Sequence, residues 1–350
     1  MYVFNNIFFR QMNERYSRQI LFSSIGKSGQ EKLSNSRVLL VGCGALGASH
    51  AEIMARAGIG FLRIVDRDFV EFTNLQRQTL YSETDAKERL PKATAAKNRL
   101  AAINSEIEID AIVADVNHSN IENLVKDVDL ILDGTDNFQI RYLINDACVK
   151  LKKPWIYGAA VSSYGTTMTI FPNQTPCLRC IFEEMPDAGT SPTCDTAGVI
   201  QPIIASISAI QTTEALKILT GNFDHLHKSL IQIDVWRNDW RKIKLNAPNA
   251  DCECCARGNF EFLDAERSEF SAVLCGRNAV QIAPPKPTQI DLQTLAARLK
   301  NLGEVKQNEY LLRLNVGEYE LTVFADARAI VRGTDDVSTA RSIYAKYIGV

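Results

Sequence analysis

The sequence predicts an α/β protein built on a doubly wound mixed sheet, followed by a small C-terminal α+β domain. Residues 37–41 form a short apolar run that ends in a glycine-rich turn, and helix-like sequence follows. A second apolar run at 61–65 ends in an acidic residue. This order of strand, turn, helix, strand and acid opens a parallel sheet of the Rossmann-like kind.

The other elements of the main domain follow from hydrophobic periodicity and turn residues. They are helices at 15–34, 48–57 and 93–104 and strands at 108–113, 130–133, 156–157 and 166–171. Residues 183–202 carry turn residues throughout and few apolar ones, which predicts a mobile functional loop. Residues 203–219 then predict a buried or interface helix that ends near Gly221.

The composition changes after Cys255, where we place a domain boundary. A stiff, proline-rich linker at 283–287 is followed by helix and strand patterns at 291–302, 310–316, 319–324 and 337–347. Asp291 is expected near the cap of the first of these helices. The predicted organisation is an N-terminal arm at 1–14, a main domain at 15–255 and a small α+β domain at 256–350.

The overall composition excludes several classes of protein. The 350 residues include 39 Lys and Arg against 41 Asp and Glu, and this near-balance argues against a basic face for nucleic acid. Apolar residues make up 46%, as in a soluble globular protein, and no run of about eighteen apolar residues predicts a membrane span. The N-terminus lacks the basic segment of a secretion signal. We therefore expect a cytoplasmic protein whose nine cysteines stay reduced.

The glycine-rich turn indicates a nucleotide. Gly42, Gly44 and Gly47 follow the GxGxxG spacing, which lets backbone N–H groups approach phosphates at a helix N-terminus. Asp66 ends the next strand, where a carboxylate can accept hydrogen bonds from ribose hydroxyls. The alternative is a tight turn inside an ordinary α/β core. On this motif alone, an NAD-dependent dehydrogenase is the leading interpretation.

Positive side chains around this motif favour ATP over NAD. Arg77 lies just beyond the acid, Lys92 lies on or near the next predicted helix, and Arg18 lies upstream. A triphosphate needs several cations because its charge must be neutralised during attack at phosphorus. The alternative is that each is a solvated surface charge, which is the usual fate of a single Arg or Lys.

An acidic segment at 133–137 follows another apolar strand. Ligands collect at the carboxyl ends of strands in open α/β sheets, so Asp136 is a candidate to hold Mg²⁺, a hard cation that prefers carboxylate and phosphate oxygens. The alternative is an Asp- and Asn-rich helix cap.

Two CxxC pairs predict a structural zinc site without a catalytic role. Cys177 and Cys180 form one pair, and Cys252 and Cys255 form the other, so four thiolates are available for tetrahedral zinc. A thioredoxin-like redox pair would explain one CxxC but not two. Cys254 adds a third thiol to the second pair, although the i,i+3 spacing favours Cys252 and Cys255.

Cys194 stands alone in the predicted loop. It is either a nucleophile that forms a thioester or disulfide-type intermediate, or a small filler residue. Cys43, Cys148 and Cys275 are interpreted as filler.

Taken in order, these motifs resemble the MoeB/ThiF adenylyltransferases, bacterial relatives of ubiquitin-activating enzymes, over about residues 13–255. The resemblance is carried by 15–19, 42–47, 66–68, 74–78, 133–137, the two CxxC pairs and 193–198. The tail after Cys255 is similar to an extension on some ThiF-type members. One departure is the stretch before Lys92, which lacks the usual glycine and leaves Lys87 and Arg89 as rivals for the Lys role.

The resemblance implies an enzyme that uses MgATP to adenylate the C-terminal glycine of a small ubiquitin-fold sulfur carrier and releases pyrophosphate. Cys194 matches a loop cysteine that some members use in sulfur transfer. Arg18 often reaches in from the partner subunit of a homodimer, and a sulfurtransferase or cysteine desulfurase is a possible further partner. The implied nucleotide and Mg²⁺ contacts are Gly42, Gly44, Ala45, Gly47, Asp66, Asp68, Asn74, Gln76, Arg77, Lys92, Asp136 and Asn137.

Four functions compete at this point. The C-terminal extension favours a carrier of thiazole (thiamine) synthesis, and a carrier of molybdopterin synthesis is the alternative within the family. An NAD-dependent oxidoreductase leaves Asn74, Arg77 and the four thiols unexplained. A non-catalytic binder of a ubiquitin-fold partner would not need Arg18, Arg77 and Asp136.

Overall fold

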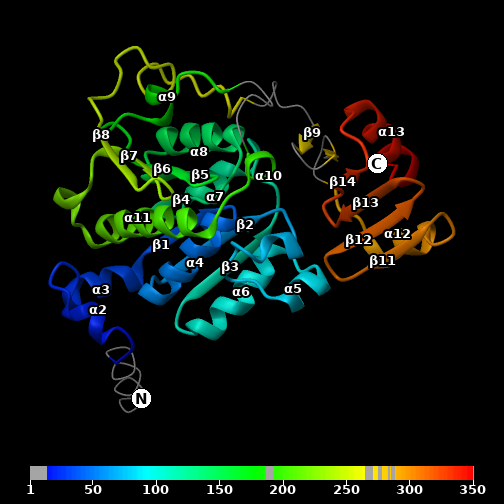
Figure 1. The fold of residues 1–350 in the computed structure, drawn as a ribbon, viewed down its shortest axis with the longest axis horizontal. Coiled ribbons are helices and arrows are strands. Elements are labelled where there is room, and N and C mark those ends of the chain that lie inside the picture. Colours follow the sequence, from blue (N-terminus) through cyan, green and yellow to red (C-terminus); the bar gives the residue numbers. More distant parts are fainter. Residues whose placement is uncertain are drawn as a thin grey trace. The chain divides into compact units, whose positions relative to one another are not determined.

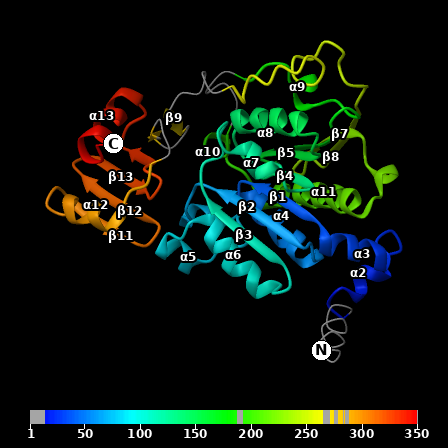
Figure 2. The same cartoon turned by 180° about the vertical axis from the view of Figure 1, so that it is seen from behind.

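The computed structural model describes residues 14–186, 193–264, 271–274, 278–282, 284 and 288–349. Figures 1 and 2 show the fold from two sides. The chain divides into two compact units, residues 1–186 with 199–265, and residues 187–198 with 266–350. The predicted N-terminal arm apart from Glu14, part of the predicted loop, most of the proline-rich linker and Cys275 lie outside the described residues.

The first unit contains an eight-stranded mixed sheet in the order β3-β2-β1-β4-β5-β6-β7-β8. The strands are β1 Arg37–Val41, β2 Phe61–Asp66, β3 Glu108–Val113, β4 Leu130–Asp133, β5 Trp155–Val161, β6 Tyr164–Ile170, β7 Ser229–Asp234 and β8 Asp239–Lys244. Along this order, neighbouring strands from β3 through β2, β1 and β4 to β5 pair in parallel. Neighbouring strands from β5 to β8 pair antiparallel. The predicted α/β class with a mixed sheet is confirmed.

Helices cover both faces of this sheet, which makes it doubly wound (Figure 1). The alternation of β1 shows the two cores directly, because Val38 and Leu40 pack in one hydrophobic cluster and Leu39 and Val41 pack in the other. The first cluster includes α4 Ala45–Ala57, α6 Lys92–Ile103 and α11 Gln201–Thr220, and the second includes α7 Ile121–Val125 and α8 Phe138–Lys150. Among the described residues, no helix is both long enough and apolar enough to cross a bilayer.

The structure divides the single helix predicted at 15–34. Helix α2 covers Ser17–Leu21 and α3 covers Gly26–Asn35, because Phe22 is extended and ends the first helix. Three predicted helices begin earlier than expected, α4 at Ala45, α6 at Lys92 and α11 at Gln201. The remaining short helices are η1 Phe72–Asn74, α5 Glu83–Glu88, α9 Leu178–Ile181, α10 Cys194–Ala197 and η2 Phe223–His225.

The second unit is built on a six-stranded antiparallel sheet in the order β11-β12-β13-β14-β10-β9. Its strands are β9 Ser271–Leu274, β10 Ala279–Ile282, β11 Glu304–Gln307, β12 Leu311–Val316, β13 Tyr319–Phe324 and β14 Ala329–Arg332. Helices α12 Leu292–Leu299 and α13 Val337–Tyr347 share one hydrophobic core with this sheet. Asp291 caps α12 as predicted, since its carboxylate accepts from the Gln293 N–H.

Candidate active site and metal centre

The loops that follow β1 and β4 touch each other at the carboxyl edge of the sheet. Gly42 has a φ of +82°, and a Cβ built on it would lie 2.9 Å from the Gly134 carbonyl oxygen. A Cβ on Gly47 would lie only 2.0 Å from the Gly42 carbonyl oxygen. Strand order reverses between β1 and β4, so this is the topological switch point at which open α/β sheets bind ligands. Gly42 and Gly47 are therefore required by close backbone contacts.

Gly44 differs from the other two glycines because nothing crowds it. A Cβ at this position would meet only Gln78 Nε2, at 3.9 Å. Gly44 is the N-cap of α4, and Ala45 is the first residue of that helix, so the backbone N–H groups here have no partner within the helix. Gln78 is buried, and its Oε1 atom has no hydrogen-bond partner. That orphan acceptor fits a ligand with a hydroxyl or amino donor.

Asp66 connects the glycine-rich turn to the end of β2. Its Oδ2 atom accepts from the Cys43 N–H at 2.6 Å, and its Oδ1 atom accepts from the Asp68 N–H at 2.7 Å. Burial raises the pKa of Asp66, although the positive charge of Lys92 opposes the increase. Each oxygen retains a second lone pair that is available for a ribose hydroxyl.

Of the three basic residues that compete for the lysine role, the structure brings Lys92 to this site. Its side chain is only 6% exposed, and its Nζ lies 3.1 Å from Asp68 Oδ2. Lys87 is 64% exposed and forms an i,i+4 ion pair with Glu83. Arg89 is the left-handed C-cap of α5 and lies over the Phe69 ring.

The two acids of the segment after β4 have different surroundings. Asp133 is buried, and it accepts from Arg141 Nε at 3.0 Å and from the Thr135 N–H at 2.9 Å. Asp136 is exposed. Burial acts to lower the pKa of the Arg67 and Arg141 guanidinium groups, but nearby carboxylates, among them Asp136, outweigh it and raise the pKa of both. Asp136 therefore lies within electrostatic reach of two arginines that the motif spacing does not identify.

The remaining predicted nucleotide contacts have local roles in the structure. The Asn74 side chain accepts from the Glu71 N–H, and the Asn137 side chain caps α8 by accepting from the Ile140 N–H. Gln76 Nε2 donates to the Val199 carbonyl at 3.4 Å, and Arg77 donates to the Thr73 carbonyl at 2.8 Å.

Arg18 is exposed on α2.

Cys194 lies in the second unit, where it is the first residue of α10 and is partly exposed. The Thr193 hydroxyl caps this short helix by accepting from the Thr196 N–H at 3.2 Å.

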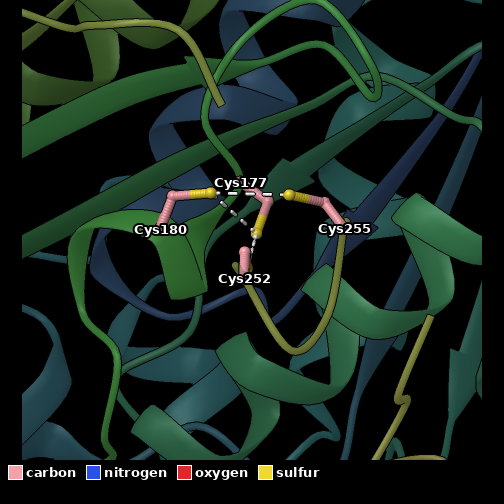
Figure 3. Close-up of side chains that lie close together, drawn as sticks. All are labelled: Cys177, Cys180, Cys252 and Cys255. Carbon is pink, nitrogen blue, oxygen red and sulfur yellow. Dashed lines mark hydrogen bonds between the residues drawn. The ribbon is translucent and has the colours of Figure 1, made fainter. Parts of the chain in front are cut away.

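The four cysteines of the two CxxC pairs converge on one point, as Figure 3 shows. Their Sγ atoms all lie within 4.8 Å of one another, and the contacts Cys177–Cys180, Cys177–Cys252 and Cys180–Cys255 measure 3.8, 3.6 and 3.4 Å. Tetrahedral zinc with Zn–S bonds of about 2.3 Å separates its sulfurs by roughly 3.8 Å, so the four thiols fit a zinc ion. Burial and the adjacent Cys180 thiol raise the pKa of Cys255 to about 12, and a bound cation would deprotonate such a thiol.

Cys254 is excluded from this group of four. It is fully buried, and its Sγ accepts from the Asn145 side-chain amide at 3.2 Å. Among the described residues, the group of sulfurs that all lie within 4.8 Å of one another includes Cys252 and Cys255 but not Cys254.

Comparison with known proteins gives one family and several close relatives. The model described as "ThiF family" matches residues 16–254. The sulfur carrier protein ThiS adenylyltransferase of Bacillus subtilis (strain 168) is 44% identical over 340 residues, which cover 97% of this chain and 100% of that protein. The adenylyltransferase and sulfurtransferase MOCS3 of Culex quinquefasciatus is 39% identical over 243 residues, which cover 69% of this chain and 55% of that protein.

A solved structure supports the fold assignment. The crystal structure of E. coli MccB with ATP is similar to this chain with a TM-score of 0.60 and 25% identity, covering 69% of this chain and 74% of that one.

Proposed function

Because the chain belongs to the ThiF family, we propose that it is an ATP-dependent adenylyltransferase. Its substrate is the C-terminal glycine of a small ubiquitin-fold sulfur carrier protein, and its by-product is pyrophosphate. The observation that carries this proposal is the switch point between β1 and β4, where the open Gly44 turn and the buried Lys92 are grouped with Asp66 and Asp68. The 44% identity to a ThiS adenylyltransferase over 97% of the chain supports the same assignment.

The nucleotide would bind across the loops at the ends of β1 and β2. Backbone N–H groups of Gly44 and Ala45 approach phosphate, and Asp66 accepts from ribose hydroxyls. Gln78 adds an acceptor that sequence spacing alone does not select, because its buried Oε1 has no partner within the protein. Gly42 and Gly47 shape the same site through the close backbone contacts of the turn. Gln76 contributes through its hydrogen bond to the Val199 carbonyl.

The reaction joins two anions, so alignment and neutralisation of charge account for the catalysis. A carboxylate oxygen of the carrier attacks the α-phosphorus, the new C–O–P bond forms, and the bond to the bridging oxygen breaks with release of pyrophosphate. Lys92, Arg77 and Asn74 bind the phosphates. Arg18 is exposed on α2 beside Leu21 and Phe22, which are 72% and 60% exposed, and we propose that it serves the site of a second copy in a homodimer.

Asp136 is suited to hold Mg²⁺. It is exposed, and Mg²⁺ in nucleotide sites is bound by one or two carboxylates together with phosphate oxygens. When bound, the ion would supply further positive charge to the triphosphate. The four thiols of the CxxC pairs would hold Zn²⁺ as a structural ion, because all four protein ligands leave no open coordination position for a reacting group.

The length of the match favours a carrier of thiamine synthesis over one of molybdopterin synthesis. An alignment of 340 residues with the ThiS adenylyltransferase includes the second unit, whereas 243 residues align with the MOCS3 protein. We further propose a cytoplasmic location and a sulfurtransferase or cysteine desulfurase as the sulfur donor. Cys194, at the start of α10, would then take part in sulfur transfer.

The test is ATP–pyrophosphate exchange with a carrier that ends in Gly-Gly. Such a carrier can be obtained by pull-down from cells with ATP and identified by mass analysis. Calorimetric titration should show ATP binding and no NAD binding, which separates an adenylyltransferase from an oxidoreductase. A protein that binds ATP and carrier without exchange would instead be the non-catalytic binder.

Asp136→Ala should abolish exchange, because it removes the proposed metal ligand. The matched control is Asp224→Ala, which removes an exposed acid on η2 and should leave exchange unchanged. Near-normal exchange in folded Asp136→Ala protein would contradict the metal role.

A further inference from the structure

Helix α8 runs between the two candidate sites. Asn137 caps its first turn and directly follows Asp136, the proposed Mg²⁺ ligand. Asn145 lies eight residues further along, which is about 12 Å at the usual rise of an α-helix. Asn137, Arg141 and Asn145 are spaced four residues apart, so they lie along one side of the helix.

Asn145 contacts both halves of the cysteine cluster with a single side chain. Its Oδ1 atom accepts from the N–H of Leu178, which lies between Cys177 and Cys180, at 2.8 Å. Its Nδ2 atom donates to Sγ of Cys254, which lies between Cys252 and Cys255, at 3.2 Å. Asn145 is fully buried, so loss of either bond would leave a buried polar group without a partner.

Neighbouring residues of α8 make further bonds to the same region. Asp146 Oδ2 accepts from the Phe262 N–H at 2.9 Å, just beyond the second cysteine pair. The Tyr142 hydroxyl lies 2.8 Å from the carbonyl oxygens of both Phe182 and Glu184, just beyond the first pair, and its one proton is donated to either of them. Both cysteine segments are therefore attached to one helix at several points.

The other end of α8 is attached equally firmly to the loop after β4. Arg141 donates to Asp133 Oδ2 at 3.0 Å, to the Thr135 carbonyl at 2.6 Å and to the Gly158 carbonyl at 3.0 Å. Asp133 in turn accepts from the N–H and hydroxyl of Thr135. The position of the segment that carries Asp136 thus depends on where α8 lies.

We propose that α8 couples the metal centre to nucleotide binding, and that Asn145 is the positioning residue through which the coupling acts. This inference rests on the four-thiolate metal site of the proposed function. With metal bound, the two cysteine segments have one relative position, and Asn145 bonds to both of them. Without metal, the segments separate, the amide of Asn145 cannot satisfy both bonds, and α8 no longer holds the 133–137 segment in place.

The first test is the rate of metal release in excess chromogenic chelator. Asn145→Leu removes both bonds, whereas Asn145→Asp keeps the acceptor for Leu178 and loses the donor to Cys254. Loss of a partner just outside the metal ligands typically costs about 10–100-fold in metal affinity, so we expect release at least about tenfold faster from Asn145→Leu. Gln139→Leu, at an exposed position in the first turn of the same helix, is the matched control and should release metal at the wild-type rate.

The second test is the ATP dissociation constant before and after chelation, with reductant present and the fold checked by circular dichroism. Chelation should weaken ATP binding to wild-type protein at least about fivefold, the low end of coupling between two sites. It should have little further effect in Asn145→Leu, where the coupling is already broken. If Asn145→Leu or the metal-free protein unfolds, the release rate of Asn145→Asp decides.

Different results would contradict the coupling, the metal site and the proposed function. Wild-type release rates in the Asn145 variants, or equal ATP affinity with and without metal, contradict the coupling. Wild-type protein that is purified without zinc contradicts the metal site on which the inference rests. Failure of ATP binding in zinc-loaded wild-type protein contradicts the proposed function and leaves the role of Asn145 in metal retention to the release assay.

Discussion

Side chains of the same chemical type differ in their exposure to water, and this difference distinguishes their roles. Lys92 is almost completely buried beside Asp68, while Lys87 is solvated in a surface ion pair. Surface pairs contribute little because water screens them, so Lys87→Ala should cost at most about 1 kcal/mol. The Asp133 carboxylate accepts hydrogen bonds from Arg141 and Thr135 inside the protein, whereas Asp136 is exposed. Only some of the charged side chains in the sequence motifs are therefore placed where they can bind a ligand.

Cys194→Ala should retain ATP–pyrophosphate exchange. Adenylation needs no protein nucleophile, and the residues proposed to bind ATP lie between Arg18 and Asn137. The measurement is exchange with carrier, followed by a separate assay for transfer of sulfur to the carrier. Loss of exchange in a folded variant would mean that the thiol takes part in activation itself.

His50 should make the protein less stable in acid. Its side chain is fully buried, its Nε2 lies 2.9 Å from Gln211 Oε1, and burial lowers its pKa to about 4. Between a pH of about 6.5 and 4, His50 is protonated in the unfolded chain but stays neutral in the folded chain. The free energy of unfolding therefore falls as the pH falls. The full loss from this group is roughly 3 kcal/mol, from 1.4 kcal/mol per pKa unit.

Urea unfolding of wild type and His50→Gln at pH 7, 6 and 5 measures this term. The Gln variant removes the titrating group, so its stability should fall less over the same range. Parallel stability profiles for the two proteins would show that His50 does not contribute. The other titrating groups are the same in both proteins, so their effect cancels in the comparison.

At the scale of elements, the glycine-rich turn combines two kinds of glycine. A methyl group at Gly47 would lie 2.0 Å from a backbone oxygen that cannot move without displacing β1. A methyl group at Gly44 would enter open space. One position thus serves packing between the turn and α4, and the other serves the approach of a ligand.

Gly47→Ala should destabilise the protein by about 1–3 kcal/mol or more, which is the usual effect of adding a methyl group to a well-packed core. Gly44→Ala should lose much less stability, because only the preference for Gly over Ala at the N-cap is lost, and it should weaken ATP binding, because the added methyl lies where phosphate approaches. Thermal unfolding and calorimetric ATP titration of both variants check this pair. Equal stability of the two variants would contradict the distinction.

Helix α8 illustrates why some elements escape sequence analysis. All of its residues from Arg141 to Val149 are buried, so the helix has no polar face and shows no clear period of 3.6 residues. Helix α4 is also mostly buried, but the glycine-rich turn marks where it begins. Helices with a solvent face, such as α12, show apolar residues on one side only, and the sequence reveals them.

At the scale of the whole molecule, the two units have separate hydrophobic cores. The residues proposed to bind ATP all lie in the first unit, and the alignment with the MOCS3 protein includes 243 residues. A chain that ends at Ala265 should therefore bind ATP with nearly wild-type affinity.

The check is calorimetric titration of this shortened chain, with circular dichroism as the control for folding. A folded product that no longer binds ATP would show that the second unit contributes to the nucleotide site. Carrier-dependent exchange, measured in parallel, would then report what the second unit adds to recognition of the carrier.

The α/β class, the resemblance to the ThiF family and the two pairs of cysteines that could share a metal can all be predicted from the amino-acid sequence. These features depend on spacing along the chain, such as GxGxxG before a helix or two CxxC pairs, and spacing is visible without a structure. Three further features are visible only in the folded chain: the amide of Asn145 donates to Cys254, Lys92 rather than Lys87 approaches Asp68, and Gln78 borders the glycine-rich turn. Those choices depend on burial and on which strands become neighbours, and both arise from contacts between residues that are distant in the sequence.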